Sequence, residues 1–75
     1  MRVEKLVAMA NQIARNLAVQ GEDEATAGTA DHIARFWDPR MRSAIIAHAN
    51  AGGDDLLPAA RAAVLSLPVP ASPRP

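Results

Sequence analysis

Apolar residues recur at helical spacing in the first part of the chain. Between residues 3 and about 18 they lie three or four positions apart and so share one side of a helix: Leu6, Met9, Ala10, Ile13 and Leu17. Gly21 then supplies a stop signal. The segment GEDE places three acidic residues ahead of a second helix, where the helix dipole favours negative charge. That helix is predicted over residues 23–37, although the glycine at position 28 costs about 1 kcal/mol in a helix. Its apolar face contains Ala30, Ile33 and Trp37.

The Asp38-Pro39 step is the strongest local signal in the sequence. A residue before proline avoids the helical region, so the second helix ends here. Asp is a good N-cap and proline suits the first helical position, so a third helix starts at the same point. It runs to about Asn50 and stops before Gly52-Gly53. Its apolar stripe is formed by Met41, Ala44, Ile45 and His48, widened by Ile46 and Ala49.

The last part of the chain predicts one more helix and an extended tail. The segment DDLLP opens a short fourth helix, with Asp54 or Asp55 as its cap and Pro58 in its first turn. The residues that share a face of this helix are Leu57, Ala60, Val64 and Leu67. Proline at every second or third position excludes helix from residues 68–75 and predicts a stiff extended tail. The predicted fold is all-α: residues 1–67 form a small bundle of three to four short helices, followed by the Pro-rich tail.

The composition indicates a chain that needs a partner. Its 75 residues include seventeen alanines but only two aromatic residues, so few large side chains are present to bury. Domains of this size are usually reinforced by disulfides, a metal ion or a partner, and the absence of cysteine excludes disulfides. A net charge of zero argues against a general nucleic-acid or membrane-surface binder. Because the sequence shows neither a membrane-spanning apolar run nor a secretory signal, we expect a cytoplasmic protein.

Both aromatic residues fall in one stretch, HIARFWDPRMR, at the predicted corner between the second and third helices. Trp37 precedes the cap, and we expect the guanidinium group of Arg42 to lie over its indole ring. This packing leaves Arg40 unexplained. Tryptophan and arginine are enriched at binding hot spots, so we expect one ring to pack inward and the other to meet a partner together with the arginines. The predicted partner-interface residues are His32, Phe36, Trp37, Arg40, Arg42 and His48.

The sequence shows no pattern of catalytic or metal-binding residues. The two histidines are far apart along the chain, and a metal site would need carboxylates such as Asp31 or Asp38 to join them. A hydrogen-bonding role at the corner for His32 and a half-buried helix position for His48 are the simpler interpretations. Ser43 has no neighbouring acid–base pattern that would mark a nucleophile. We therefore expect no catalytic, cofactor-binding or metal-binding residue in this chain.

An alternative function is that of a small helix-turn-helix-like DNA-binding or regulatory module. The third helix would read the DNA, and the side chains placed to contact phosphates would be Arg35, Arg40 and Arg42. The neutral net charge and the sparse polar reading face weigh against it.

Four segments of the chain form a specific pattern when they are taken in order. They are MANQIA at 9–14, DHIARFWDPRMR at 31–42, AHANAGGDDLLP at 47–58 and AARAAV at 59–64. Together they resemble the delta subunit of NAD-dependent formate dehydrogenase, one of the soluble bacterial molybdenum enzymes. The resemblance covers most of residues 3–67 and does not extend to GEDEATAG or to the proline tail.

The resemblance implies a small accessory subunit beside three larger partners. In that family the alpha subunit holds the molybdenum bis-guanine-dinucleotide cofactor (Mo-bis-MGD) and oxidises formate to CO2. Iron–sulfur clusters pass electrons to the beta subunit, which carries FMN and reduces NAD, and the gamma subunit carries a further cluster. The delta subunit holds none of these groups. The implied role of this chain is non-catalytic: it stabilises the complex of alpha, beta and gamma subunits or helps it to mature.

Overall fold

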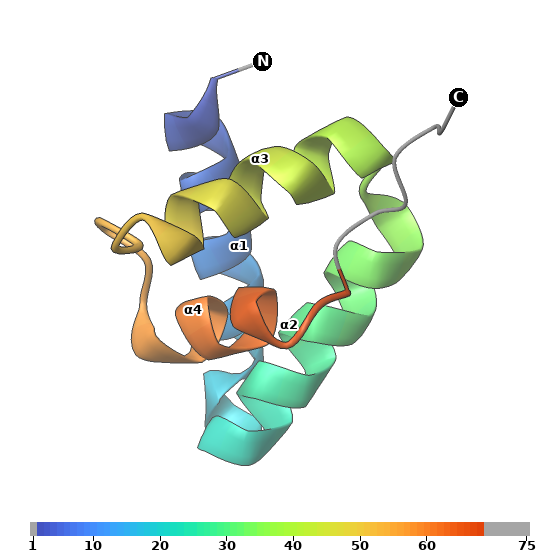
Figure 1. Ribbon diagram of the computed structural model, residues 1–75. Coiled ribbons are helices and arrows are strands. Elements are labelled where there is room, and N and C mark those ends of the chain that lie inside the picture. The colour runs from blue at the N-terminus through green and yellow to red at the C-terminus, as the bar shows by residue number, and fades with distance from the viewer. Residues whose placement is uncertain (1, 69–75) are drawn as a thin grey trace.

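The part of the chain that the computed structural model describes, residues 2–68, is built from helices and contains no β-strand (Figure 1). The helices are α1 (Val3–Leu17), α2 (Glu22–Phe36), α3 (Pro39–Asn50) and α4 (Pro58–Leu65), and a short 3₁₀ segment, η1 (Ala18–Gln20), connects α1 to α2. The predicted all-α fold is confirmed. The predicted proline tail falls, from residue 69 onward, outside the described residues.

The breaks between helices lie where the sequence predicts them. Gly21 adopts a φ of 105°, a conformation that residues with a Cβ rarely adopt, and the acidic residues after it occupy the first turn of α2. At the next break, Asp38 is the N-cap of α3: its Oδ1 accepts a hydrogen bond from the Met41 backbone N–H at 2.9 Å. Pro39 follows as the first helical residue. Backbone constraints at glycine and proline thus set these boundaries.

The predicted cap of α4 is wrong. Neither Asp54 nor Asp55 caps the helix, because the N-cap residue is Leu57, whose side chain makes no capping hydrogen bond. Asp55 instead has a positive φ of 68° in the loop before the helix. Pro58 determines the start of α4, since its fixed φ suits the first turn and it has no N–H that needs a partner.

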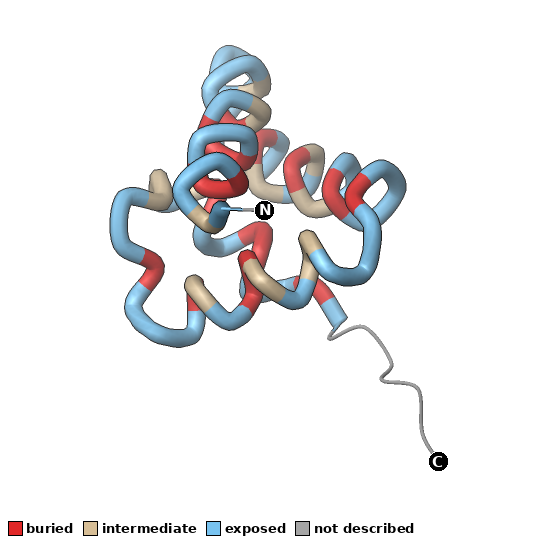
Figure 2. The backbone as a smooth tube through the Cα atoms, turned by 90° about the horizontal axis from the view of Figure 1, so that it is seen from above, coloured by how far each residue is buried: buried red, intermediate tan, exposed pale blue. Residues whose placement is uncertain are grey.

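Each helix buries one side against its neighbours. Helix α2 packs against α1 and α4, whereas α3 turns away from α2 at the corner and packs against α1 and α4. In Figure 1, α3 and α4 accordingly lie together in front of α1. Buried and exposed positions alternate along the helices in Figure 2, as expected for amphipathic helices around one core. The buried cluster contains Leu6, Val7, Ala10, Ala14, Ile33, Trp37, Ile45, Ile46, Ala49, Ala60, Val64 and Leu67.

Small residues allow the helices to approach closely. Four of the residues in this core cluster, Ala10, Ala14, Ala49 and Ala60, are alanines with almost no exposed surface. At Gly28 a Cβ atom would lie only 2.5 Å from Leu17 Cδ1, so this glycine leaves room for the end of α1 beside α2. The resulting core is compact but has few large side chains.

The buried side of α1 differs from the predicted one. The predicted face included Met9 and Ile13, but the structure centres the buried side on Leu6, Ala10 and Ala14. Met9 is 37% exposed, and Ile13 is half-buried. Part of the apolar side of α1 is therefore not buried by the other helices of this chain.

The buried sides of the last two helices follow the predicted faces more closely. On α3, the most deeply buried residues are Ile45, Ile46 and Ala49, and the other predicted members of its stripe are half-buried. The predicted face of α4 is confirmed, with Leu57 as its half-buried edge. Within residues 2–68, no helix has the length and apolar character needed to cross a membrane.

Candidate partner interface

The corner between α2 and α3 sends its two aromatic rings to opposite sides. Helix α2 ends at Phe36, and Trp37 takes an extended conformation before the cap of α3. Trp37 is only 4% exposed and belongs to the core, whereas Phe36 is 71% exposed. One ring thus packs inward, as expected, while the expected contact of the other ring with a partner stays a prediction. In this structure the indole of Trp37 lies in the core, so Phe36 is the aromatic ring left for a partner.

Hydrogen bonds fix the shape of the corner. The Trp37 N–H donates to the Ile33 carbonyl at 3.1 Å, and the Arg42 N–H donates to the Asp38 carbonyl at 3.0 Å. The guanidinium group of Arg42 donates from Nη1 to the carbonyl oxygen of Trp37. The expected placement of Arg42 over the indole ring is therefore wrong, because its guanidinium group bonds to the backbone of Trp37. Half-buried Arg42 belongs to the framework of the corner.

The outer side of α2 carries an exposed aromatic pair. The rings of His32 and Phe36 lie 4.8 Å apart between centroids and are tilted by 45°, as expected for residues one helical turn apart. Beside them, Arg35 Nε and Asp31 Oδ1 form an ion pair at 3.1 Å. These residues of α2 line a groove together with Gly28 and with Ile13, Asn16 and Leu17 of α1. His32 and Phe36 therefore face solvent together, next to a half-buried part of α1.

Arg40 follows the cap of α3 and lines a second groove. Its side chain is exposed in the first turn of α3. The groove is lined by Arg2, Lys5, Leu6, Met9, Asp38, Arg40 and Met41, so it joins the first turns of α1 and α3. Within residues 2–68, the one ion pair with a separation of 4.0 Å or less is that of Arg35 with Asp31. Arg40 is thus not neutralised by a carboxylate of the described chain.

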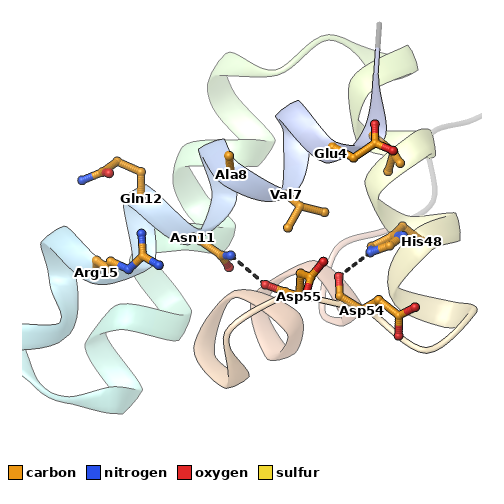
Figure 3. Close-up of a pocket in the computed structure, with 10 residues that line it drawn as sticks. Glu4, Val7, Ala8, Asn11, Gln12, Arg15, His48, Asp54 and Asp55 are labelled. Atoms are coloured by element: carbon orange, nitrogen blue, oxygen red, sulfur yellow. Dashed lines mark hydrogen bonds between the residues drawn. The ribbon is translucent and has the colours of Figure 1, made fainter.

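His48 lies apart from the other predicted interface residues. Its Nε2 is 2.7 Å from the carbonyl oxygen of Asp54, and the ring is half-buried beside the loop that connects α3 to α4 (Figure 3). The predicted half-buried position is confirmed. A groove lined by α1 and this loop includes His48, whereas the corner residues line different grooves.

The sequence analysis missed Asn11, which holds the loop between α3 and α4. Its Nδ2 donates to the Asp55 carbonyl, and its Oδ1 accepts from the Leu57 N–H, both at 2.8 Å. Figure 3 shows the amide of Asn11 pointing from α1 toward this loop. The feature of the sequence that could have indicated this role is the position of Asn11. It lies one helical turn after Val7 and next to Ala10, on the buried side of α1. A polar residue at such a position needs hydrogen-bond partners.

The described residues around the corner form exposed surface grooves. Among residues 2–68, no three side chains of His, Asp or Glu come together as a metal-binding group. The sequence has no cysteine, the residue whose thiolate holds iron–sulfur clusters in proteins. The distinctive features are an exposed phenylalanine and unpaired cations around the corner.

The chain was compared with known protein families, curated proteins and solved structures. No curated protein and no solved structure matches it. Residues 5–64 match the family described as "NADH-dependant formate dehydrogenase delta subunit FdsD". The matched segment includes nearly all of the four helices, the corner and the loop held by Asn11. This chain therefore belongs to the FdsD family of formate dehydrogenase delta subunits.

Proposed function

We propose that this chain is a non-catalytic subunit of an NAD-dependent formate dehydrogenase, where it stabilises the complex or helps it to mature. The observation that carries this proposal is the family match over residues 5–64. The larger alpha, beta and gamma subunits would be its partners. Formate oxidation at Mo-bis-MGD, electron transfer through iron–sulfur clusters and NAD reduction at FMN would take place in those subunits, in the cytoplasm.

The surface of the chain supports a role in binding. Phe36 is one of only two aromatic residues in the chain, and it lies largely outside the core. A phenylalanine side chain that becomes fully buried contributes about 1.5–3 kcal/mol relative to an exposed one. Isolated, this chain does not gain that stabilisation. A partner that covers Phe36 would supply it.

The structure gives no specific support to the DNA-binding alternative. Arg42, one of the three arginines expected at phosphates, donates to the Trp37 carbonyl, and Arg35 pairs with Asp31. Of this set, only Arg40 has neither an ion pair nor a side-chain hydrogen bond among the described residues. With zero net charge, the chain lacks the general attraction to phosphates on which DNA binding depends.

Deleting the gene for this chain tests the proposal in the host. We expect extracts of the deletion strain to show less formate-dependent NAD reduction and less assembled complex on size-exclusion chromatography, with both restored when the chain is re-expressed. The molybdenum content of the larger subunits separates the two roles, because a maturation factor affects metal loading and a purely stabilising subunit affects only assembly. Unchanged activity, assembly and metal content would contradict the proposal.

A further inference from the structure

The incompletely buried apolar residues of α1, Met9 and Ile13, continue into the corner. Met9 lines the groove that contains Met41 and Arg40, and Ile13 lines the groove that contains Phe36. Met9 and Ile13 are four residues apart on α1, so their side chains are neighbours on one side of the helix. The two grooves therefore follow one another along the same side of α1, one at Met9 and the next at Ile13. They form one surface, the α1 face, defined by Arg2, Lys5, Met9, Ile13, Phe36 and Arg40.

Positive charge surrounds one end of the α1 face. Arg2, Lys5 and Arg40 are exposed there, and none of them has a carboxylate oxygen within 4.0 Å among residues 2–68. The one acidic side chain that lines this groove, Asp38, accepts the Met41 N–H as a helix cap.

The helix ends add to this positive charge. Helices α1 and α3 both begin at this groove. The positive ends of their dipoles therefore lie at the same place as the three cations. This end of the α1 face is therefore locally basic, although the whole chain is neutral.

We propose that the α1 face is the docking surface for a larger subunit whose contacting surface is apolar at its centre and acidic opposite Arg2, Lys5 and Arg40. Charge complementarity selects this occupant. The apolar part, Met9, Ile13 and Phe36, would be covered, and the cations would form the rim, where electrostatic attraction guides association. The inference rests on the proposed function and adds the surface and the chemistry of its partner.

A second copy of this chain is the alternative occupant. Its three consecutive exposed acidic residues, Glu22, Asp23 and Glu24, would be the acidic cluster that meets the α1 face of the first copy. These residues start α2 and do not line either groove of the α1 face. Such a contact would join two different surfaces and would extend from copy to copy unless it closed into a ring. A larger partner with an acidic surface would cover the α1 face in a single contact, and no chain of copies would form.

Retention of the chain in the purified complex tests the docking surface. The parent and each variant are co-expressed with the larger subunits, the complex is purified through a tag on one of them, and the dissociation constant of the chain is measured by dilution. We expect Phe36→Ser to weaken binding roughly thirtyfold, as for an interface hot spot. The double variant Lys5→Glu/Arg40→Glu is expected to weaken it by about tenfold or more, and most strongly at low salt.

Matched controls separate the α1 face from general effects. Arg15→Glu reverses one positive charge on a part of α1 that does not line either groove of the face, and it is compared with Lys5→Glu and Arg40→Glu made singly. Val19→Ser removes an apolar side chain that is 90% exposed in η1. We expect both to bind like the parent. Circular dichroism of each free variant shows whether its helix content is kept.

The outcomes distinguish this inference from the proposed function. If the parent does not stay with the larger subunits, the proposed role as a stabilising subunit of the complex fails. If the parent stays and the α1-face variants bind equally well, or the controls lose binding to the same extent, the docking surface is wrong. Sedimentation of the parent and variants tests the second copy: a change in self-association without a change in retention would also overturn the proposal.

Discussion

Replacing Asn11 by alanine tests whether one side chain holds the α3–α4 loop against α1. The amide is 8% exposed and makes two hydrogen bonds of 2.8 Å to the backbone at Asp55 and Leu57. Each such bond contributes about 1 kcal/mol net, and a buried group left without a partner costs about 1–3 kcal/mol. Asp55 is exposed, so water can reach its freed carbonyl. We therefore expect the free energy of unfolding to fall by about 2 kcal/mol, a roughly thirtyfold change in the folding equilibrium.

Urea denaturation of the full chain, followed by far-ultraviolet circular dichroism, measures this loss. The matched control is Gln12→Ala, because the neighbouring amide is exposed and bonds only within its own helix, to Asn16 Oδ1 at 3.1 Å. Gln12→Ala is expected to change the free energy of unfolding by less than about 0.5 kcal/mol. A third variant, Asn11→Asp, keeps the acceptor for the Leu57 N–H but places an oxygen against the Asp55 carbonyl oxygen. We expect its loss to equal or exceed that of the alanine variant.

Two results would refute this reasoning. Equal stabilities of the Asn11→Ala and Gln12→Ala chains would show that the bonds to the loop add nothing beyond an exposed amide contact. A stable Asn11→Asp chain would show that the Asp55 carbonyl does not depend on the amide donor.

Three further predictions concern stability. Asp38→Ala should lower the free energy of unfolding by about 1 kcal/mol in urea denaturation, because the Met41 N–H loses its cap; an unchanged value would mean that Pro39 alone sets the start of α3. Thr29→Val should raise the free energy of unfolding by about 1 kcal/mol, because the buried Thr29 hydroxyl has no hydrogen-bond partner within the described residues. A lower free energy of unfolding would show that the hydroxyl does have a partner. The isolated chain should be marginally stable and melt below about 60 °C in circular dichroism, since its core contains few large side chains. A sharp, concentration-independent melt of a monomer well above that temperature would contradict this expectation.

The helix boundaries were predictable because they depend on local backbone chemistry. Gly21 and Pro39 restrict the backbone whatever the rest of the chain does, and the structure breaks the helices at both positions. The α4 cap was mispredicted because an aspartate near a proline resembles a cap in sequence. The turn around Asp55 depends on a bond from Asn11, forty-four residues away.

The candidate interface was only partly predictable for a related reason. Neighbouring residues at the end of a helix point to different sides, so one of Phe36 and Trp37 had to face outward, but the choice depends on where α1 and α4 pack. Likewise, apolar spacing on α1 includes Met9 without indicating whether the core or a partner covers it. Periodicity gives the apolar width of a helix, and the tertiary packing decides how much of it remains exposed.

The most direct test of the central claim is affinity purification of this chain from its own host with a small C-terminal tag. The account predicts that larger subunits co-purify in fixed proportion to the chain, as identified by mass spectrometry, and that the eluate reduces NAD with formate while the chain alone does not. Elution of the chain by itself, or with nucleic acid and without formate-dependent NAD reduction, would contradict its assignment as an accessory subunit of a formate dehydrogenase.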